Sequence, residues 1–578
     1  MLRIKRTLSF LFWSILFGVA YTQAPLYYSN QNQYFLHGLA HGLGNLNQDW
    51  LANTIDPTPV FSYVVGLTFH QQIQTPDLQY VHENLFYLYY ILILGLYFHS
   101  LVGIGRFCEP ALNGKPLARL VFITLFVAIH AGILRLASAT LFGVDYPWYF
   151  QAGVAGQYVL GFGLQPSVFG VFLLASINAS LRNRPWLAAT LACVAGIMHG
   201  TYLLCAAMLI VAYQIILVQD KQLKKAILLG LWALAVVLPV VIYNVIAFAP
   251  TSPEIFAEAQ RILAHFRIPH HAEVARWLDG IALAQVALIV GGIYLVRKAN
   301  LRLIMIVVFT WSLLLTLIQV ATDNDTLALL FPWRTSAVLV PLATAVVLAR
   351  LVGVLARRTG WESYPTMSQG MCWTSLGIFF AGGLVISFFG LGYRTNPDEL
   401  PLLEFVRKAP PYIEFFRGKD GEIWVDPGFH PQPWPLYLLP VDIPELDTGK
   451  RGAASTNFTP APRAGKNGHL IAIDLQRFRI ATGKPIYVDF KSIPYKDTDV
   501  VEWYRRLLWA QKLYADHSWD NEATLLELWQ TGIGITDVVT TGSKEIVGSA
   551  WEKVFEDPKN PNYRVYRPQF WLADWKLP

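Results

Sequence analysis

Long apolar stretches recur along the first two thirds of the chain and become rare in the last third. A helix needs about 20 mostly apolar residues to cross a hydrocarbon core of about 30 Å, and many of the stretches approach that length. The pattern therefore predicts a polytopic α-helical membrane protein with about 11 spans, at residues 7–24, 85–105, 118–137, 164–181, 186–198, 201–218, 226–248, 280–296, 302–321, 334–356 and 372–393.

Residues 394–578 have a different pattern, in which short apolar runs alternate with charged and turn-forming residues. This alternation is typical of an α/β sandwich, so we expect a C-terminal α/β soluble domain after the membrane domain of residues 1–393. The predicted helices are 397–408, 498–515 and 521–531, and the predicted strands are 422–426, 470–474, 485–489, 535–540 and 563–567.

Lysine and arginine in short loops mark the cytoplasmic side of a membrane protein. If residues 186–218 form a hairpin that crosses twice, with His199-Gly200 as its outer turn, every basic cluster falls on one side. The N-terminus is then cytoplasmic and the C-terminal domain lies outside. A single crossing of 186–218 remains the alternative. The clusters are Arg3/Lys5/Arg6, Arg106/Lys115/Arg119, Arg182/Arg184, Lys221/Lys224/Lys225, Arg297/Lys298/Arg302 and Arg350/Arg357/Arg358.

Composition and charge agree with this division. Only 15% of the residues are charged and 54% are hydrophobic, whereas soluble domains contain about 25% charged residues. Of the 84 Asp, Glu, Lys and Arg residues, 36 lie in residues 1–393 and 48 in residues 394–578. These values exclude a wholly soluble or disordered chain. We expect no nucleic-acid partner, because no zinc-finger or RNA-recognition motif is present.

Two carboxylates stand out in the first outside loop, residues 25–84. The loop is far longer than the usual connection of about 4–6 residues, and long loops are commonly functional. Asp49 and Asp56 lie in its stretch NQDWLANTIDPTPVFS, and either can act as a general base. The alternative is structural, because Asp is also common at helix caps and at turns such as Asp56-Pro57.

Basic and imidazole groups occur in later segments that the topology also places outside or at the membrane surface. Guanidinium forks bind phosphate oxygens in bidentate geometry, whereas carboxylates can hold a divalent cation such as Mg²⁺ or Mn²⁺. Each group also has a structural alternative, such as snorkelling of an arginine at the interface. In segment 250–279, Thr251 or Ser252 is placed to cap a helix that begins at Pro253. The candidates are Arg267, His270 and His271 in segment 250–279, Arg334 at a span edge, and His199 at the hairpin turn.

This arrangement resembles the GT-C membrane glycosyltransferases, which have a short cytoplasmic N-terminus, a large first outside loop with an acidic catalytic residue, many spans and often a C-terminal outside domain. The chain also resembles a family of bacterial membrane proteins without an established activity. The shared stretches are YFLHGLAHG, NQDWLANTIDPTPVFS, FRIPHHAEVARW, FPWRTS and YVDFKSIPYKDTDVVEWYRR. The resemblance implies a multi-pass protein of the bacterial inner (plasma) membrane with a periplasmic or extracellular C-terminal domain.

The GT-C resemblance further implies inverting transfer of a sugar from a polyprenyl-phosphate-linked donor to an acceptor on the outer side. Asp49, or else Asp56, would take the proton of the acceptor hydroxyl. Donors aimed at the departing lipid phosphate would stabilise its charge, and these are Arg267, His270, His271 and Arg334, with His199 as a further substrate-binding residue. The chain departs from the family at SNQNQY, where many members carry an acidic pair.

Two other function classes remain open. One is a transporter or flippase for a lipid-linked or anionic solute, although the spans contain few ionisable groups beyond His130, Arg135 and His199. The other is a non-catalytic membrane protein that keeps a GT-C shell, which the missing acidic pair favours. In the C-terminal domain, charged residues around Asp489 and Lys491 fit a salt-bridged helix–strand junction better than a site.

Overall fold

The fold is given by a computed structural model. It describes residues 2–40, 46, 48–70, 79–358, 365–393, 396–409, 435–440, 475–515, 528, 534–541, 545–548, 550–557 and 563–568. The stretches predicted as strands 422–426 and 470–474, and nearly all of the predicted helix 521–531, lie outside these residues.

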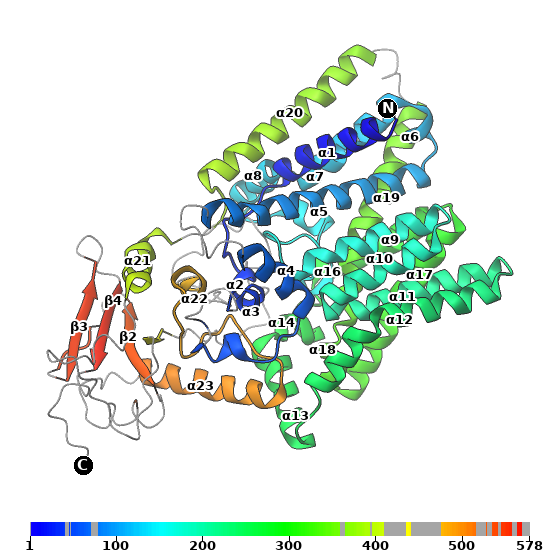
Figure 1. The fold of residues 1–578 in the computed structure, drawn as a ribbon. Helices are drawn as coiled ribbons and strands as arrows, with labels where there is room; N and C mark the ends of the chain where they lie inside the picture. Colours follow the sequence, from blue (N-terminus) through cyan, green and yellow to red (C-terminus); the bar gives the residue numbers. More distant parts are fainter. Residues whose placement is uncertain are drawn as a thin grey trace.

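Helices make up almost all of the chain before residue 393, as predicted (Figure 1). The long ones are α1 (Leu2–Tyr21), α4 (Pro59–His70), α5 (Gln79–Cys108), α7 (Pro116–His130), α8 (Gly132–Phe142), α9 (Val171–Leu181), α10 (Pro185–Met198), α11 (Leu203–Gln219), α12 (Leu223–Ala247), α13 (Pro253–Arg261), α16 (Gly280–Leu295), α17 (Ala299–Thr322), α19 (Ser336–Arg358) and α20 (Pro365–Phe389). Short helices in the connecting segments are α2 (Gln31–Tyr34), α3 (Leu36–Ala40), α6 (Ala111–Gly114), α14 (Pro269–Ala272), α15 (Val274–Trp277) and α18 (Asp325–Leu329).

A multi-pass membrane architecture is confirmed. The number of helices long enough to cross a membrane is smaller than the number of spans that the sequence pattern predicts. Within the described residues, 6 helices are long and apolar enough to cross a membrane, or up to 7 if the bent pair α7 and α8 is one span. The helices at Pro166–Leu181, Pro185–Met198 and Gly280–Leu295 are apolar but shorter than 18 residues. At 1.5 Å per residue each is under about 27 Å long, less than a core of about 30 Å.

The membrane helices pack in two connected groups (Figure 1). Helix α1 packs between α5 and α20, and α7 and α19 complete that group. Helices α9, α10, α11, α12 and α17 form the second group, which α5 and α16 join to the first. Where α20 crosses α1, a Cβ atom at Gly383 would overlap the carbonyl oxygen of Val19. Small residues permit such close backbone approach between membrane helices.

Helices α10 and α11 form an antiparallel hairpin that reverses at His199. The backbone of His199 is extended there (φ −153°, ψ 111°), which ends α10. The Oγ atom of Ser176 lies 2.7 Å from the carbonyl oxygen of Ala188 and 2.7 Å from the hydroxyl of Tyr213. Ala188 of α10 and Tyr213 of α11 therefore lie at the same level along the two helices. The chain enters and leaves the hairpin at the same end, as the two-crossing prediction requires.

Basic clusters gather at one end of the helices. The Glu109 carboxylate accepts hydrogen bonds at 2.9 Å from both Arg350 and Arg357, and Lys298 lies 5.3 Å from the ring centre of Phe107. Lys115 donates to a carbonyl at the end of α19 at 3.1 Å. This gathering agrees with a shared cytoplasmic side, but which face of the membrane it occupies stays a prediction.

The C-terminal part contains a small four-stranded sheet with strand order β1-β2-β4-β3. The strands are β1 (Leu436–Leu438), β2 (Ile535–Thr541), β3 (Trp551–Glu556) and β4 (Tyr563–Pro568). Strand β1 is parallel to β2, and the other pairs are antiparallel. The predictions at 535–540 and 563–567 are confirmed. The one at 485–489 is wrong as a strand, because only a single bridge, Tyr437 to Ile486, forms there.

Helices of the C-terminal part agree better with the prediction. The segment at 397–408 contains the short 3₁₀ helix η11 (Pro397–Glu399) and α21 (Leu400–Lys408). The second predicted helix is α23 (Asp497–Ala515), and α22 (Phe478–Thr482) was not predicted. Helix α23 packs against α13, and the Asp497 carboxylate accepts hydrogen bonds from the backbone and hydroxyl of Thr251 at 2.6 and 2.8 Å. The C-terminal part is thus attached to the loops of the membrane part.

The hairpin makes a topology prediction. In a variant without native cysteines, Arg184→Cys and Lys221→Cys should react with a membrane-impermeant maleimide from the same side of the membrane, because both lie at the open end of the α10–α11 hairpin. A cysteine at Ser252, before α13, should react from the opposite side and serves as the control. Labelling of positions 184 and 221 from opposite sides would contradict the antiparallel hairpin.

Candidate functional site

Five segments that are distant in sequence converge beyond the ends of the membrane helices. They are the first loop around α2 and α3, the loop before α9, the segment that links α13 to α14, the turn before α19, and residues 489–495 of the C-terminal part (Figure 1). Their polar side chains face one another, and most are buried. This convergence is the candidate functional site.

Local sequence explains how Arg267 and the two histidines reach it. Ser252 caps α13 by accepting a hydrogen bond from the Ile255 amide at 3.2 Å, as the sequence predicts for Thr251 or Ser252. The helix continues as the π-helix η8 (Ile262–Arg267), and Pro269 then opens α14. A π-helical turn carries an extra residue and is frequent at functional sites. The break places Arg267 and the His270–His271 pair close together.

Arg267 is an almost fully buried guanidinium, with 6% of the residue exposed. It donates to the backbone carbonyl of Lys491 at 2.7 Å and lies 4.9 Å from the ring centre of Phe490. Its Nε atom is buried and has no hydrogen-bond partner in the described part of the chain. A buried donor without a partner is costly and calls for a ligand, water or ion.

Lys491 lies beside it with only 5% of the residue exposed. Its Nζ atom donates to the side-chain oxygen of Asn30, whose amide nitrogen donates to the Tyr158 hydroxyl at 3.0 Å. Burial, reinforced by the charge of Arg267, lowers the pKa of Lys491 to about 7. The ammonium is therefore easily deprotonated unless an anion joins it.

Arg334 approaches the same region from the turn before α19. Phe331, in the left-handed region (φ 50°), precedes the 3₁₀ helix η9 (Pro332–Thr335), which carries Arg334. The guanidinium donates to the side-chain oxygen of Gln157 and lies 4.9 Å from the ring centre of Tyr202. Its Nε atom, like that of Arg267, is buried without a hydrogen-bond partner among the described residues. Two guanidinium groups thus keep unused donors inside the site.

The histidine pair lies between these cations. The two imidazole ring centres are 4.1 Å apart, and Nδ1 of His271 donates to the carbonyl of Ala155 at 2.6 Å. Burial and the neighbouring positive charges lower the pKa of His271 to about 4 and that of His270 well below its usual value. Both imidazoles are therefore neutral at pH 7. His270 can donate or accept a hydrogen bond, whereas His271, whose Nδ1–H is used on Ala155, can only accept one at Nε2.

Tyr34 connects the two halves of the site. Its ring centre lies 5.7 Å from that of His199, and its hydroxyl interacts electrostatically with both Arg334 and Arg267. The ring of His199 also contacts Tyr202, with 5.7 Å between ring centres. Arg267, Arg334 and His199 therefore lie around one cluster of tyrosines. His270 and His271 are within reach of the charge of Arg267, and His271 also of that of Arg334. Their role as ligands of a substrate stays a prediction.

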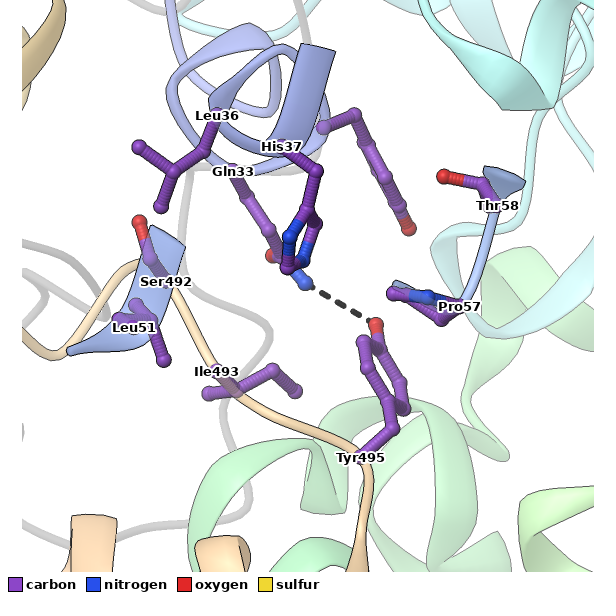
Figure 2. Close-up of a pocket in the computed structure, with 10 residues that line it drawn as sticks. Gln33, Leu36, His37, Leu51, Pro57, Thr58, Ser492, Ile493 and Tyr495 are labelled. Atoms are coloured by element: carbon purple, nitrogen blue, oxygen red, sulfur yellow. Dashed lines mark hydrogen bonds between the residues drawn. The ribbon is translucent and has the colours of Figure 1, made fainter. Parts of the chain in front are cut away.

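A hollow opens next to this cluster (Figure 2). Figure 2 shows the amide of Gln33 donating to the hydroxyl of Tyr495, with 3.0 Å between the two atoms. His37 and Thr58 face the same space from the first loop, and Ser492 faces it from the C-terminal part. The remaining lining residues are Tyr34, Leu36, Leu51, Pro57 and Ile493. Amides, hydroxyls and an aromatic ring beside apolar walls suit a polar, uncharged group.

The charge balance of the site is strongly positive. Arg267, Lys491 and Arg334 make no ion pair within 4 Å among the ion pairs of the described residues. The carboxylate nearest in the sequence, Asp489, is bound instead by Arg479 and by the Ser492 amide. Buried charges are normally paired or neutralised, so this arrangement favours binding of an anion.

Asp49 is held in a different environment from the one expected of a base. Its side chain is fully buried and accepts hydrogen bonds from Arg479 Nε at 2.6 Å, from the Ile486 amide at 3.0 Å and from the Ala52 amide at 2.9 Å. Arg479 also binds Asp489, so the three side chains form an ion-pair chain between the first loop and the C-terminal part. This geometry fits the structural alternative for Asp49, and its role as a base stays a prediction.

Asp56 is half-buried and lies next to the hollow. One carboxylate oxygen accepts from the Thr58 amide at 2.8 Å, which is the turn expected of Asp56-Pro57, and α4 begins just after it at Pro59. Its backbone carbonyl accepts from the Tyr243 hydroxyl at 2.7 Å. The following residues, Pro57 and Thr58, line the hollow. Of the two predicted bases, Asp56 is therefore the one beside the candidate site, and its catalytic role stays a prediction.

A divalent cation has no ready set of ligands here. Within the described residues, no group of three or more His, Cys, Asp and Glu side chains is placed to hold a metal ion. His265 lies between two carboxylates, at 2.8 Å from Glu273 and 2.8 Å from Asp325, which uses both of its ring nitrogens. The Mg²⁺ or Mn²⁺ prediction stays untested, and no step proposed below passes through a metal.

Lys491 and the tyrosines were not predicted as site residues. The sequence pattern predicts a salt-bridged helix–strand junction for the charged residues around Lys491. Arg505 and Arg506 do form ion pairs, both with Glu502. The signal for Lys491 was its position between apolar residues in YVDFKSIPY. A lysine within an apolar run is unlikely to be solvated, and buried lysines are commonly functional or paired.

Comparison with known proteins adds one finding. Residues 468–510 match a family described as a domain of unknown function, DUF6798. No curated protein matches the chain. No solved structure matches it either. The matched segment includes Lys491, Tyr495 and most of α23, so it overlaps the part of the C-terminal region that faces the candidate site.

Two buried arginines provide a matched test of the charge imbalance. Arg479 is bound by two carboxylates and Arg267 by none. Arg479→Met should lower the free energy of unfolding by about 3–5 kcal/mol, the usual effect of breaking a buried pair. Arg267→Met should change it by less than about 1.5 kcal/mol or raise it, because a charge without a partner is removed. Denaturation of detergent-purified protein without added phosphate measures both. Equal losses would contradict the assigned imbalance.

Proposed function

We propose that the chain is an integral membrane sugar transferase of the GT-C type that uses a polyprenyl-phosphate-linked donor on the outer side of the bacterial inner membrane. The observation that supports it best is the set of buried cations without carboxylate partners, located beyond the ends of the apolar helices. In this proposal the chain crosses the membrane eleven times, with its N-terminus in the cytoplasm. The first helix, α1, and the three shorter apolar helices then count as crossings too, the shorter ones within a locally thinner or distorted bilayer.

The cations would hold the phosphate of the lipid donor. The free Nε donors of Arg267 and Arg334 are matched in chemistry to phosphate oxygens. The neutral imidazole of His270 can donate a hydrogen bond without adding charge. His271 already donates its Nδ1–H to Ala155, so it would lie beside the phosphate and donate to it only when protonated. Negative charge grows on the lipid phosphate as the sugar leaves, and groups fixed in advance around it stabilise that charge. The polyprenyl chain extends from this point along the apolar helices.

The hollow as it stands has room for about one water molecule, so the sugar would bind there, beside the phosphate, only after the surrounding loops move apart. Gln33, His37, Thr58, Ser492 and Tyr495 offer hydrogen bonds to hydroxyl groups there. The acceptor hydroxyl attacks the anomeric carbon, forming a new carbon–oxygen bond while the bond from that carbon to the phosphate oxygen breaks. The acceptor proton passes to the Asp56 carboxylate, and the lipid phosphate departs with the electron pair. The configuration at the anomeric carbon is inverted.

Replacement of Asp56 by Asn tests this assignment. The side-chain oxygen of Asn can accept the same hydrogen bond from the Thr58 amide, so the turn before α4 and the stability of the protein should be kept. Loss of a general base should reduce transfer by about 10²–10⁴-fold. Transfer of labelled sugar from a polyprenyl-phosphate donor, in reconstituted vesicles, measures the effect. Asp323→Asn, at an exposed left-handed position that Asn tolerates, is the control. Full activity in Asp56→Asn would exclude this base.

The same vesicles separate the two competing functions. A transporter or flippase would move the lipid-linked solute across the bilayer without forming a new glycosidic bond. A non-catalytic protein would do neither, although it could still bind the lipid phosphate. Only sugar transfer that depends on the protein supports the proposed reaction.

A further inference from the structure

Lys491 has the features of a direct anion ligand that comes from the C-terminal part. Its Nζ atom donates to one oxygen, that of Asn30, and a protonated amine has three donors. At least nine-tenths of Lys491 is buried, and the same holds for Arg267. The Nε atom of Arg267 has no hydrogen-bond partner among the described residues. The two residues are adjacent, since Arg267 donates to the carbonyl of Lys491 itself. The guanidinium of Arg267 thus contacts the backbone of Lys491, and the two buried cations are close enough for the charge of Arg267 to act on the Lys491 amine.

Other ionisable groups around Lys491 do not supply a counter-charge. From its own segment, Asp489 interacts only at a distance and is bound by Arg479. From η8 and α14 the neighbours are Arg267 and the neutral pair His270 and His271. The hydroxyls of Tyr34, Tyr158 and Tyr495 surround the region from the first loop, the loop before α9 and the C-terminal segment, and burial raises the pKa of each.

We propose that Lys491 and Arg267 together bind one phosphate-type dianion, and that Lys491 takes up a proton when the anion binds. The C-terminal segment matched by DUF6798 is then part of the anion site and not only a cover over it. The inference rests on the proposed function only in identifying the anion as the phosphate of a lipid. A free phosphate ion has the same chemistry and is the other possible source.

The pH dependence has a definite sign. Without the anion, the pKa of Lys491 is about 7, so at pH 8 most of the amine is neutral. A bound dianion favours the charged form and raises this pKa. Binding of the dianion at pH 8 should therefore take up close to one proton. At pH 6 Lys491 is already mostly charged and about half of a phosphate monoester is a monoanion, so binding of the dianion should release protons instead. Affinity should weaken as the pH rises above 7. A phosphate monoester is already a dianion at pH 8, because its second pKa is about 6.

Calorimetry on the full-length protein in detergent tests the inference without any sugar. The probes are dodecyl phosphate, which mimics a lipid phosphate, and inorganic phosphate. Titrations at pH 8 in two buffers of different ionisation enthalpy give the number of protons taken up. Lys491→Met should weaken dodecyl phosphate binding at least tenfold and abolish proton uptake. Tighter binding of dodecyl phosphate than of inorganic phosphate would indicate a lipid source, and the reverse a soluble ion.

Lys491→Arg and Lys512→Met complete the design. Arg keeps the charge at every pH, so binding should persist while proton uptake is lost, and this variant also provides the test if Lys491→Met does not fold. Lys512 is an exposed lysine of α23, and Lys512→Met should behave as the unmodified protein. Unchanged affinity and proton uptake in both Lys491 variants would overturn the inference.

The outcomes also distinguish this inference from the proposed function. If phosphate binding depends on Lys491 but no sugar is transferred, the anion site stands and the transferase proposal fails. If Lys491→Met transfers sugar at the normal rate, the transferase proposal stands and Lys491 is not a ligand of the reacting phosphate.

Discussion

The ion pair between Asp49 and Arg479 joins two parts of the chain that are 430 residues apart in sequence. Both side chains are buried, and Arg479 binds Asp489 with its other arm. A buried pair of this kind is strongly destabilised when one member is lost, because the other remains charged without a partner. The pair therefore fixes the C-terminal segment against the first loop. The positions of Lys491 and Tyr495 depend on that attachment.

The same ion-pair chain also determines the charge of the candidate site. Arg479 binds both Asp49 and Asp489, the carboxylates that would otherwise be free to approach Lys491 and Arg267. The remaining cations face tyrosines, amides and neutral imidazoles, which are polar but carry no negative charge. Structural stability and affinity for an anion thus arise from one distribution of charges. A carboxylate added near Lys491 would compete with a ligand for the same donors.

Much of the fold could be predicted because it depends on local pattern. Apolar length located the membrane helices, and Ser252 before Pro253 located the start of α13. Strand β1 was missed because three residues between prolines give almost no alternation to detect. The prediction at 485–489 was wrong because its apolar residues are buried against neighbouring helices and loops, with only one bridge to the sheet.

The site could be predicted in part, for a related reason. Arg267, His270, His271, Arg334 and His199 are unusual residues in apolar surroundings, so composition alone drew attention to them. The partners of Asp49 could not be inferred, because they lie hundreds of residues away and come from a part of the chain that looked independent. The role of Lys491 was hidden by the charged residues near it, since Arg505 and Arg506 pair with Glu502 on their own helix.

The contact of Lys491 with Asn30 spans 461 residues, and this separation affects biosynthesis. At about 5–20 residues per second, a ribosome needs roughly 20–90 s to make the intervening chain. The early helices can enter the bilayer during that interval, while the half of the site they carry lacks its partner. A truncated product, however well inserted, has no complete anion site. The two halves of the candidate site therefore meet only after residue 491 has been made.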